Sequence, residues 1–538
     1  MTKGHKQTDI QNLPGCACEF IETVVRKMRY RKKVRRDVQA ELAAHFEDEL
    51  KDCKTDEQRE QKAQQLVGGF GDVKLLAILL RRAKKRCRPL WRKVLVRGFQ
   101  AVGVFILYIL ICSAPLVGRP TISVNYVDWL NDKAKAGRDE SENAYPYYER
   151  AVAACVKMPD GLYWNRNKWP ADLNDVEIQR YLKWVNDNKK ALDFLIEGNK
   201  RPYYWPVYSA TGTDLSKGII DITYFSEYRT LVFALDWRSR YKAYKGDVES
   251  AFDDCVSLVR FGSRLQGQGL FNEQSAGVAF GAYAQDAIRT IIEKVDVPAD
   301  TLKNLQEQLQ TEFTKYDSLI NLEMEKVFTY DYIQRSFTDD GKGGGRMLAR
   351  GAALAVGDWK SGLWRFVSLS YPDRREMTAK VDQYFELFGQ LLDITPWQMH
   401  QKGGPGEWEE MARNSLYLKI TAPAYGMAGE IGWRMKTDRT ALLTVLALQR
   451  YEKDNGAYPE NLRALVESGY LKKLPMDPYS DGPLVYNKTD ESFILYSFGE
   501  NLSDDGGKSG LGRDGKPRMW ADNGDWVFRP EPESEVTQ

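Results

Sequence analysis

The chain has 538 residues, of which 43% are hydrophobic, 12% aromatic and 28% charged. This composition, with a mean hydropathy of −0.51, excludes an intrinsically disordered chain and a polytopic membrane protein. Only three residues are histidines, which disfavours a histidine-built metal centre or catalytic triad. The length suits roughly three or four domains of about 150 residues each.

The charge is divided unevenly along the chain. The net charge is +2, but residues 1–97 hold 24 basic and 13 acidic side chains, a net charge of +11. The remainder, with 53 basic and 62 acidic residues, carries −9. Such a division predicts two electrostatic environments within one chain.

The charge boundary coincides with an apolar run without charged residues, at 99–117. A helix of this length extends about 28 Å, close to the roughly 30 Å core of a bilayer. We therefore predict one transmembrane helix, at 94–117. A cleaved signal peptide would begin much nearer the N-terminus, and a buried core helix would usually carry a polar stripe.

Basic residues crowd the N-terminal side of this run and are scarce after it. Because such an excess marks the cytoplasmic side, we predict a single-pass protein of the bacterial inner membrane, with a cytoplasmic N-terminus and a periplasmic C-terminal region. The basic collar would also contact anionic lipid head groups. Nucleic-acid binding by the basic segment 26–36 is the alternative, and we do not expect it because no reading element accompanies that segment. The collar consists of Arg81, Arg82, Lys84, Lys85, Arg86, Arg88, Arg92, Lys93 and Arg97.

Residues 1–90 are expected to form a cytoplasmic domain of four short helices. Apolar residues recur at helical spacing over 20–28 and 38–50, Thr55 and Gln58 form a capping box, and an apolar helix follows Asp72. The strings ELAAHFED and FGDVKLLAILLRRAKKRCRPLW resemble the HAAS-type permease prefix module, and more closely the start of a family of uncharacterised single-pass membrane proteins of planctomycete-type bacteria. The resemblance covers about a fifth of the chain and implies topology, without an activity.

Seven cysteines are spread over the predicted compartments. Four lie on the cytoplasmic side without paired CxxC spacing, so reduced thiols are favoured over a zinc site. Outside the membrane, Cys155 and Cys255 could form one disulfide, and the pairing is left open. The four cytoplasmic residues are Cys16, Cys18, Cys53 and Cys87.

The region 121–423 is expected to be an extracytoplasmic helical domain, solenoid-like or irregular. Helical periodicity covers 175–195, 272–294, 299–314 and 317–335. The segment 225–265 resembles one tetratricopeptide-type hairpin, but no second copy follows at that period. Such a domain would usually present a surface or groove to a partner.

Several residues of this region could bind a ligand or act in catalysis. An aromatic cluster could stack on a sugar ring or a peptide proline, although such clusters more often seal a core edge. It comprises Tyr203, Tyr204, Trp205 and Tyr208.

The carboxylates Glu323, Glu325 and Asp331 could act in acid–base chemistry, but positions i and i+2 point to different helix faces. The glycine-rich loop 339–345 lacks the order of a phosphate-binding loop. His400, the one histidine predicted to lie outside, has no catalytic partner motif around it.

The C-terminal region 424–538 combines a long helix with a small α+β segment. The helix over 424–453 leads through GAYP at 456–459 and LPMDP at 474–478 to two predicted strands, at 483–487 and 492–498. This order resembles the globular head of the major pseudopilin of type II secretion systems. A pseudopilin has its apolar helix directly before the head, whereas here the apolar run lies about 320 residues upstream. The head is therefore interpreted as a module reused on another anchor.

In the pseudopilin family an acidic terminal loop holds calcium, and the resemblance implies the same here. Calcium takes six to eight oxygen ligands, which carboxylates and loop carbonyls can supply. A solvated acidic turn is the alternative, because the insertion 508–520 separates the acidic groups. The candidate ligands are Asn501, Asp504, Asp505, Asp522 and Asp525.

The sequence thus predicts a mainly α protein with one transmembrane helix and a pseudopilin-like α+β head. We expect a membrane-anchored envelope protein that acts as a non-enzymatic interaction or scaffold module, with membrane lipids and an envelope protein as partners. The alternative is an extracytoplasmic glycan-binding protein or hydrolase that uses the aromatic cluster and a carboxylate such as Glu325. Apart from calcium, no cofactor is indicated.

Overall fold

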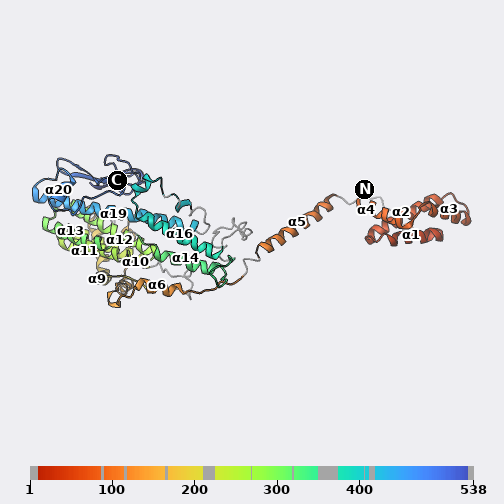
Figure 1. The fold of residues 1–538 in the computed structure, drawn as a ribbon, viewed down its shortest axis with the longest axis horizontal. Helices are drawn as coiled ribbons and strands as arrows, with labels where there is room; N and C mark the ends of the chain where they lie inside the picture. The colour runs from red at the N-terminus through yellow and green to blue at the C-terminus, as the bar shows by residue number, and fades with distance from the viewer. Residues whose placement is uncertain are drawn as a thin grey trace. The chain divides into compact units, whose positions relative to one another are not determined.

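The computed structural model describes residues 10–86, 90–113, 118–163, 168–209, 224–267, 269–317, 320–348, 373–404, 406, 408–410 and 418–530. The chain divides into two compact units, Met1–Ile111 and Cys112–Gln538, here called the N-terminal and C-terminal units. Both are mainly helical (Figure 1). Cys87 and Arg88 lie outside the described residues, as do positions 114–117 of the predicted span.

Four helices form the core of the N-terminal unit, as the periodicity predicts. They are α1 (Gly15–Lys27), α2 (Lys32–Leu50), α3 (Asp56–Gly69) and α4 (Val73–Arg86), preceded by the short turn η1 (Ile10–Asn12). Three phenylalanines meet at the centre, with the ring of Phe20 lying 6.1 Å from Phe46 and 5.3 Å from Phe70. The Thr55 hydroxyl accepts a hydrogen bond from the Gln58 N–H and so caps α3.

Helix α5 (Leu90–Ser113) carries the apolar run. Within it, Val94–Ile111 is long and apolar enough to cross a membrane, and none of this window is buried in the structure. Leaving so many large apolar side chains in water is unfavourable by about 25 cal/mol for each Å² of exposed surface. By length and composition, α5 is thus a candidate membrane span.

The C-terminal unit is built from helices with one small sheet. Its longer helices are α6 (Tyr126–Lys135), α7 (Tyr145–Ala153), α8 (Asp175–Asp187), α9 (Lys189–Asn199), α10 (Tyr224–Tyr244), α11 (Val248–Leu265), α12 (Phe271–Lys294), α13 (Ala299–Lys315), α14 (Glu323–Ser336), α16 (Arg374–Leu392) and α19 (Leu418–Asn455). The shorter elements are η3 (Glu140–Glu142), η5 (Pro170–Asp172), α17 (Pro396–Gln401) and α20 (Leu462–Glu467). Helices α10 to α13 lie side by side, and α19 packs along α12 and α13 (Figure 1).

The helix predicted over 175–195 is interrupted at Asn188, which separates α8 from α9. The Asn188 side chain is fully buried and binds the backbone of Val156, accepting from its N–H at 2.9 Å and donating to its carbonyl at 2.9 Å. An asparagine that serves a distant backbone in this way competes with helix continuation. Periodicity alone gave no sign of this break.

Close packing of α11 on α12 depends on glycine. A Cβ atom added at Gly262 would lie 2.5 Å from the carbonyl oxygen of Gly277 and 2.8 Å from the backbone nitrogen of Gly281. Any larger residue would force the two backbones apart.

The head contains a three-stranded antiparallel sheet in the order β1 (Val485–Lys488), β2 (Phe493–Ser497) and β3 (Trp526–Arg529). The first two strands agree with the sequence prediction, whereas β3 joins from about 30 residues further along the chain. Trp526 is fully buried against Tyr479, at 4.5 Å between ring centroids. The buried core runs without interruption from the helices into this sheet, so the head packs as part of the C-terminal unit.

Candidate functional site

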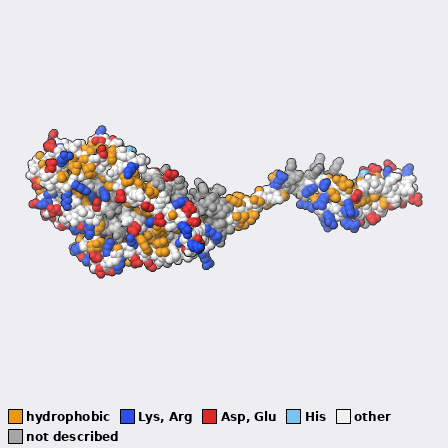
Figure 2. Space-filling view, in the orientation of Figure 1, with side chains coloured by type: hydrophobic (Ala, Val, Ile, Leu, Met, Phe, Trp, Pro, Cys, Tyr) orange, Lys and Arg blue, Asp and Glu red, His pale blue; other side chains and the backbone are white. Residues whose placement is uncertain are grey.

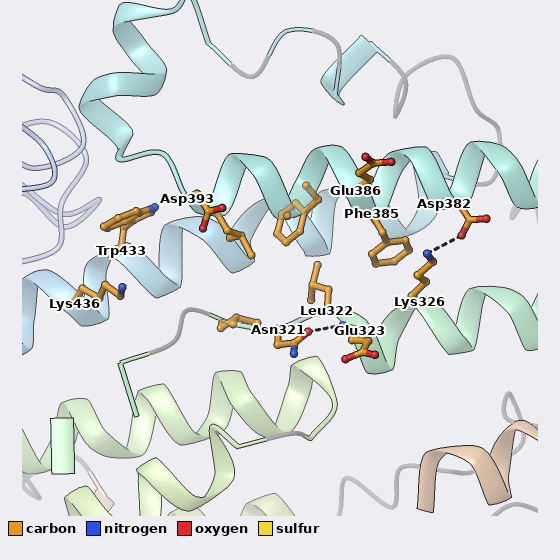
Figure 3. Close-up of a pocket in the computed structure, with 14 residues that line it drawn as sticks. Asn321, Leu322, Glu323, Lys326, Asp382, Phe385, Glu386, Asp393, Trp433 and Lys436 are labelled. Carbon is orange, nitrogen blue, oxygen red and sulfur yellow. Dashed lines mark hydrogen bonds and ion pairs between the residues drawn. The ribbon is translucent and has the colours of Figure 1, made fainter. Parts of the chain in front are cut away.

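A cleft of about 730 Å³ opens between α14, α16 and α19 in the C-terminal unit (Figure 3). Its apolar wall is formed by Leu322 before α14, Phe385 and Phe388 on α16, and Trp433 on α19. Figure 3 shows the Phe385 ring extending from α16 toward Leu322. A cleft lined in this way can receive an apolar group.

Acidic side chains outnumber basic ones around this cleft. Asp382 accepts from Lys326 at 2.7 Å and also from the Tyr330 hydroxyl, and Glu323 pairs with Lys133 at 2.8 Å. The other charged lining residues are Glu386, Asp393 and Lys436. Glu386 and Asp393 are exposed side chains of α16 and its C-terminal end, so their charge is available to a cation.

Helix α16 was not predicted from the sequence, and with it most of the cleft was missed. The sequence does contain a signal for the start of this helix. Asp373 precedes the helix, and its side chain accepts from the Glu376 N–H at 2.8 Å. This is the D-x-x-E pattern of a helix start. Which face of the helix would remain open depended on its packing and could not be read from the pattern.

The structure separates the carboxylates of α14. Glu323 lines the cleft, whereas Glu325 accepts from the backbone N–H of Phe271 at 2.7 Å and so supports the start of α12. Asp331 is buried and accepts from Arg335 at 2.8 Å and from Gln334 at 2.7 Å. The expectation that Glu323 and Glu325 face different directions agrees with this geometry.

The aromatic cluster closes a core instead of lining this cleft. Tyr204, Trp205 and Tyr208 are only 6%, 4% and 4% exposed, and Tyr203 is half-buried with the Arg138 guanidinium 4.1 Å from its ring centroid. A ligand could stack on the three buried rings only if the loop opened. Sealing a core edge was the interpretation that the sequence favoured.

Glu273, which no motif in the sequence marks, holds two tyrosines of this cluster in place. Its carboxylate accepts from the hydroxyls of Tyr208 (2.6 Å), Tyr204 (3.2 Å) and Tyr224 (3.3 Å), and from the backbone N–H of Leu270 (2.8 Å). Burial raises the pKa of Glu273, and these hydrogen bonds oppose that rise. Four donors make this carboxylate a structural centre that holds the aromatic loop.

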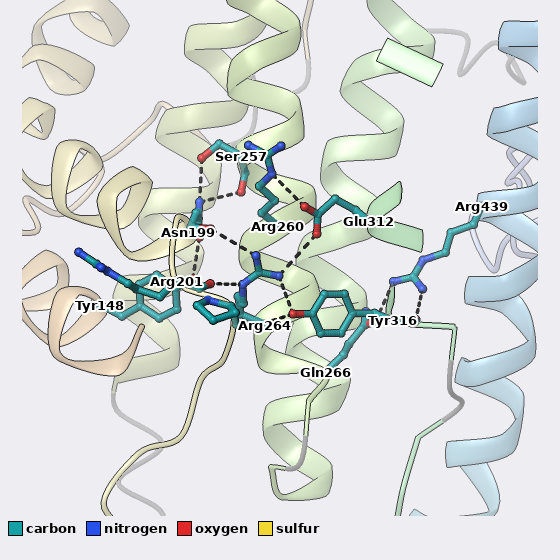
Figure 4. A network of polar contacts seen from close by, with 11 residues as sticks. Tyr148, Asn199, Arg201, Ser257, Arg260, Arg264, Gln266, Glu312, Tyr316 and Arg439 are labelled. Carbon is teal, nitrogen blue, oxygen red and sulfur yellow. Dashed lines mark hydrogen bonds and ion pairs between the residues drawn. The ribbon is translucent and has the colours of Figure 1, made fainter. Parts of the chain in front are cut away.

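A second buried network surrounds Arg264 on α11 (Figure 4). Its guanidinium donates to the carbonyl of Arg201 at 2.6 Å, to the Tyr316 hydroxyl at 2.7 Å and to Glu312 at 3.5 Å. Arg439 on α19 donates to the Tyr316 carbonyl at 2.7 Å, and burial lowers its pKa to about 10. With a further bond from Arg264 to the Asn199 carbonyl at 3.3 Å, these contacts join α9, α11, α13 and α19.

The acidic loop of the head brings together some of the proposed calcium ligands. Asp525 is fully buried and accepts from the N–H groups of Asp505 (3.2 Å) and Gly507 (2.7 Å), while Asn501 donates to Asp505 at 2.7 Å. Burial raises the pKa of Asp525 to about 6. Asp504 accepts from the Tyr496 hydroxyl at 2.9 Å, and Asp522 is exposed. Among the described residues, no group of three or more His, Cys, Asp or Glu side chains is arranged to hold a metal ion.

Five cysteines have described side chains, and all five are free thiols. Cys155 and Cys255 are free thiols, and burial raises the pKa of each to about 12. Cys16, Cys18 and Cys53 are also free. His400 lies exposed on α17, and the loop 339–345 is a turn that Asp340 stabilises by accepting from the Gly344 N–H at 2.9 Å.

Basic side chains gather on the N-terminal unit, whereas acidic and basic ones are mixed over the C-terminal unit (Figure 2). Of the collar, Arg81, Arg82 and Lys85 are exposed, and Lys84 is half-buried and pairs with Glu41 at 2.5 Å. The side chains of Arg86, Arg92 and Lys93 lie outside the described part. No protein-family model, curated protein or solved structure matches the chain.

Proposed function

We propose that this chain is a membrane-anchored envelope protein, with residues 1–90 in the cytoplasm and its C-terminal unit in the periplasm, and that it acts as a binding or scaffold module. The apolar window Val94–Ile111, which is unburied and follows the four helices α1 to α4 along the chain, supports the anchor. The basic excess on its N-terminal side supports the orientation.

Protease protection tests this topology. In spheroplasts that express the full chain, added protease should degrade the C-terminal unit and leave a fragment that contains the N-terminal unit, because the membrane shields it. Detergent lysis should then expose that fragment as well, which serves as the control. A C-terminal unit protected until lysis would contradict the orientation.

We propose further that the cleft between α14, α16 and α19 binds a protein segment that carries both basic and apolar side chains. The observation that supports this proposal is that the cleft combines an apolar wall with the exposed acidic side chains of Glu386 and Asp393. Charge complementarity of this kind favours a cationic partner and excludes an acidic one. The apolar side chains of the segment would occupy the space beside Phe385.

Gly389 allows this proposal to be tested with little effect on the fold. It is exposed, lines the cleft, and a Cβ atom there would meet no heavy atom within 4 Å. A Gly389→Trp substitution should therefore fill the cleft, and replacing a helical glycine should not weaken the helix. Gln390→Trp, at the neighbouring exposed position, is the matched control.

Binding is measured by fluorescence anisotropy of a labelled peptide of alternating lysine and leucine, with the full chain in detergent. The wild type and Gln390→Trp should bind it, binding should weaken with salt, and Gly389→Trp should bind at least about tenfold more weakly, a change of about 1.4 kcal/mol. A glutamate–leucine peptide should not bind. Equal affinity of Gly389→Trp and wild type would contradict the cleft as the site.

The C-terminal head is proposed to be a pseudopilin-like module with a calcium-binding loop. Its antiparallel sheet behind a long helix, with strand β2 packed on α19, supports this proposal. The alternative of a glycan-binding protein or hydrolase is less well supported, because the tyrosines that would contact the ligand are not available. The hydroxyl groups of Tyr204 and Tyr208 donate to Glu273 in the core.

A further inference from the structure

Helix α4 of the N-terminal unit buries one face in the four-helix core. Val73, Leu76, Ala77 and Leu80 pack against that core, and they recur at the i, i+3, i+4, i+7 spacing of a single helix face. Lys84 continues the same face and pairs with Glu41 on α2. These contacts bury the one apolar face that a surface helix of a soluble protein normally has.

The opposite face of α4 is also apolar. Leu75, Ile78 and Leu79 are 57%, 47% and 51% exposed, and they follow the same spacing shifted by two residues. Within the described residues 10–86, these three are the large apolar side chains recorded as exposed. A helix that is apolar on two opposite faces requires a second apolar environment besides its own core.

The charges beside this second face are all basic. Helix α4 contains no acidic residue, and Lys74, Arg81, Arg82 and Lys85 are exposed on it. At 100° per residue, Arg82 extends the line of Leu75 and Ile78, and the other three lie along one edge of the apolar face. An apolar face bordered by basic side chains is the pattern of a helix that lies in the surface of an anionic membrane.

The chain itself holds α4 close to the membrane. Helix α4 ends at Arg86 and α5 begins at Leu90, and four peptide steps extend at most about 14 Å. The candidate span begins one helical turn into α5, at Val94. The C-terminal end of α4 therefore lies within about 20 Å of the hydrocarbon boundary, whatever the orientation of the N-terminal unit.

We infer that the face of α4 formed by Leu75, Ile78 and Leu79 inserts into the cytoplasmic leaflet, with Arg81, Arg82 and Lys85 contacting anionic phospholipid head groups. The inference rests on the proposed membrane anchor and adds a second, lateral contact to it. This contact fixes the four-helix domain against the membrane surface. A tether through α5 alone would leave that domain free to rotate.

Lipid photo-crosslinking of the full chain in nanodiscs tests this inference. A phospholipid with a photoreactive group near the glycerol backbone is included, and mass spectrometry locates the adducts. In nanodiscs rich in phosphatidylglycerol, adducts should form on α4 as well as on α5. In phosphatidylcholine nanodiscs the α4 adducts should decrease while those on α5 remain, because only α4 depends on the head-group charge.

The decisive variant replaces Leu75, Ile78 and Leu79 with asparagine. It should lose the α4 adducts and keep those on α5, since its core-facing side chains are unchanged. The matched control replaces three polar residues of α3, namely Gln61, Gln64 and Gln65, with asparagine and should leave both sets of adducts intact. Replacing Arg82 with glutamine should lower the preference of α4 for phosphatidylglycerol about fivefold. Circular dichroism verifies that each variant is folded.

The other outcomes of the cross-linking experiment distinguish failure of this inference from failure of the membrane anchor. Adducts on α5 but none on α4 would overturn the inference and leave the anchor standing. Adducts on neither helix would overturn the anchor itself. If a protein–protein cross-linker added to the same nanodiscs joined the α4 segments of two copies, a second chain, not lipid, would cover this face.

Discussion

Two regions of the C-terminal unit hold basic and acidic side chains close together, but with opposite consequences. Around Arg264, the buried charged groups each have several partners (Figure 4). Arg264 alone contacts Asn199 of α9 and Glu312 of α13. In the cleft beside α16, Glu386 and Asp393 are exposed next to an apolar wall. The first arrangement determines how helices meet. The second leaves charge available to a partner.

This comparison shows why residue type alone does not identify a site. A glutamate beside aromatic rings occurs both at Glu273 and at Glu386, yet Glu273 accepts from three tyrosine hydroxyls in the core whereas Glu386 lies near Phe385 at the protein surface. Burial with full hydrogen bonding indicates a structural role. Exposure beside an apolar cleft indicates a binding role.

The largest effect is expected for Arg264→Ala, because this substitution removes a buried guanidinium that pairs with Glu312 and donates to the carbonyls of Asn199 and Arg201. The free energy of unfolding should fall by about 3–5 kcal/mol, measured by urea denaturation. Arg260→Ala is the control, since Arg260 also pairs with Glu312 but its side chain is 38% exposed, and it should cost about 1 kcal/mol or less. If both variants lost a similar free energy of unfolding, burial would not explain the difference in role between the two arginines.

The next effect is expected for Glu273→Gln, which weakens an acceptor shared by three tyrosine hydroxyls and should cost about 1–3 kcal/mol. The effect should depend on pH. Because burial raises the pKa of Glu273, the folded state binds its proton more tightly than the unfolded state. The resulting stability is full below the unfolded pKa and is lost as the pH rises through the folded pKa.

Glutamine does not titrate, so the stability difference between wild type and Glu273→Gln should widen from pH 7 to pH 4. Urea denaturation of both proteins across this range measures it. A constant difference would mean that the pKa of Glu273 is the same in the folded and unfolded states.

Calcium should produce an intermediate effect if the acidic loop of the head binds it. An ion at a hundredfold excess over its Kd stabilises the folded state by about 2.7 kcal/mol, which should raise the melting temperature by several degrees. Asp505→Asn should reduce this rise, whereas Asp490→Asn, in the exposed turn before β2, should not. A melting temperature indifferent to millimolar calcium would contradict the proposal.

The smallest effect is expected for Glu386→Ala and Asp393→Ala, which remove exposed charges from the cleft. Each should change the free energy of unfolding by less than about 0.5 kcal/mol while weakening the binding of the lysine–leucine peptide. A loss of stability above about 1 kcal/mol would place these carboxylates with the structural charges of the Arg264 network.

Local features of the fold could be predicted because each depends on a few neighbouring residues. The second helix of the hairpin, Val248–Leu265, begins and ends where the sequence predicts, because Asp247 caps it by accepting from the Ser250 N–H. The apolar run forms the helix α5, which is long and apolar enough to cross a membrane, because nearly all of its residues are apolar. Strands β1 and β2 follow from alternation and from the polar turn between them.

Long-range features could not be predicted, because they depend on which surfaces meet. Strand β3 pairs with β2 across a long loop, and Asn188 ends α8 because the backbone of Val156 lies beside it. The aromatic cluster was visible in the sequence, but its partner Glu273 lies about 65 residues away. Only packing brings such groups together, since burial and hydrogen bonding are properties of the whole chain.

The sequence by itself determined the helical class, the apolar span and the division of charge at that span, because hydropathy and net charge add along the chain regardless of how it folds. The tertiary structure decided which charges are available. It buried Arg264 and Glu273 with full sets of partners, left Glu386 and Asp393 beside an open cleft, and exposed a second apolar face on α4. The physical reason is that a side chain can act on a partner only where the fold has not already satisfied its charge or covered its apolar surface.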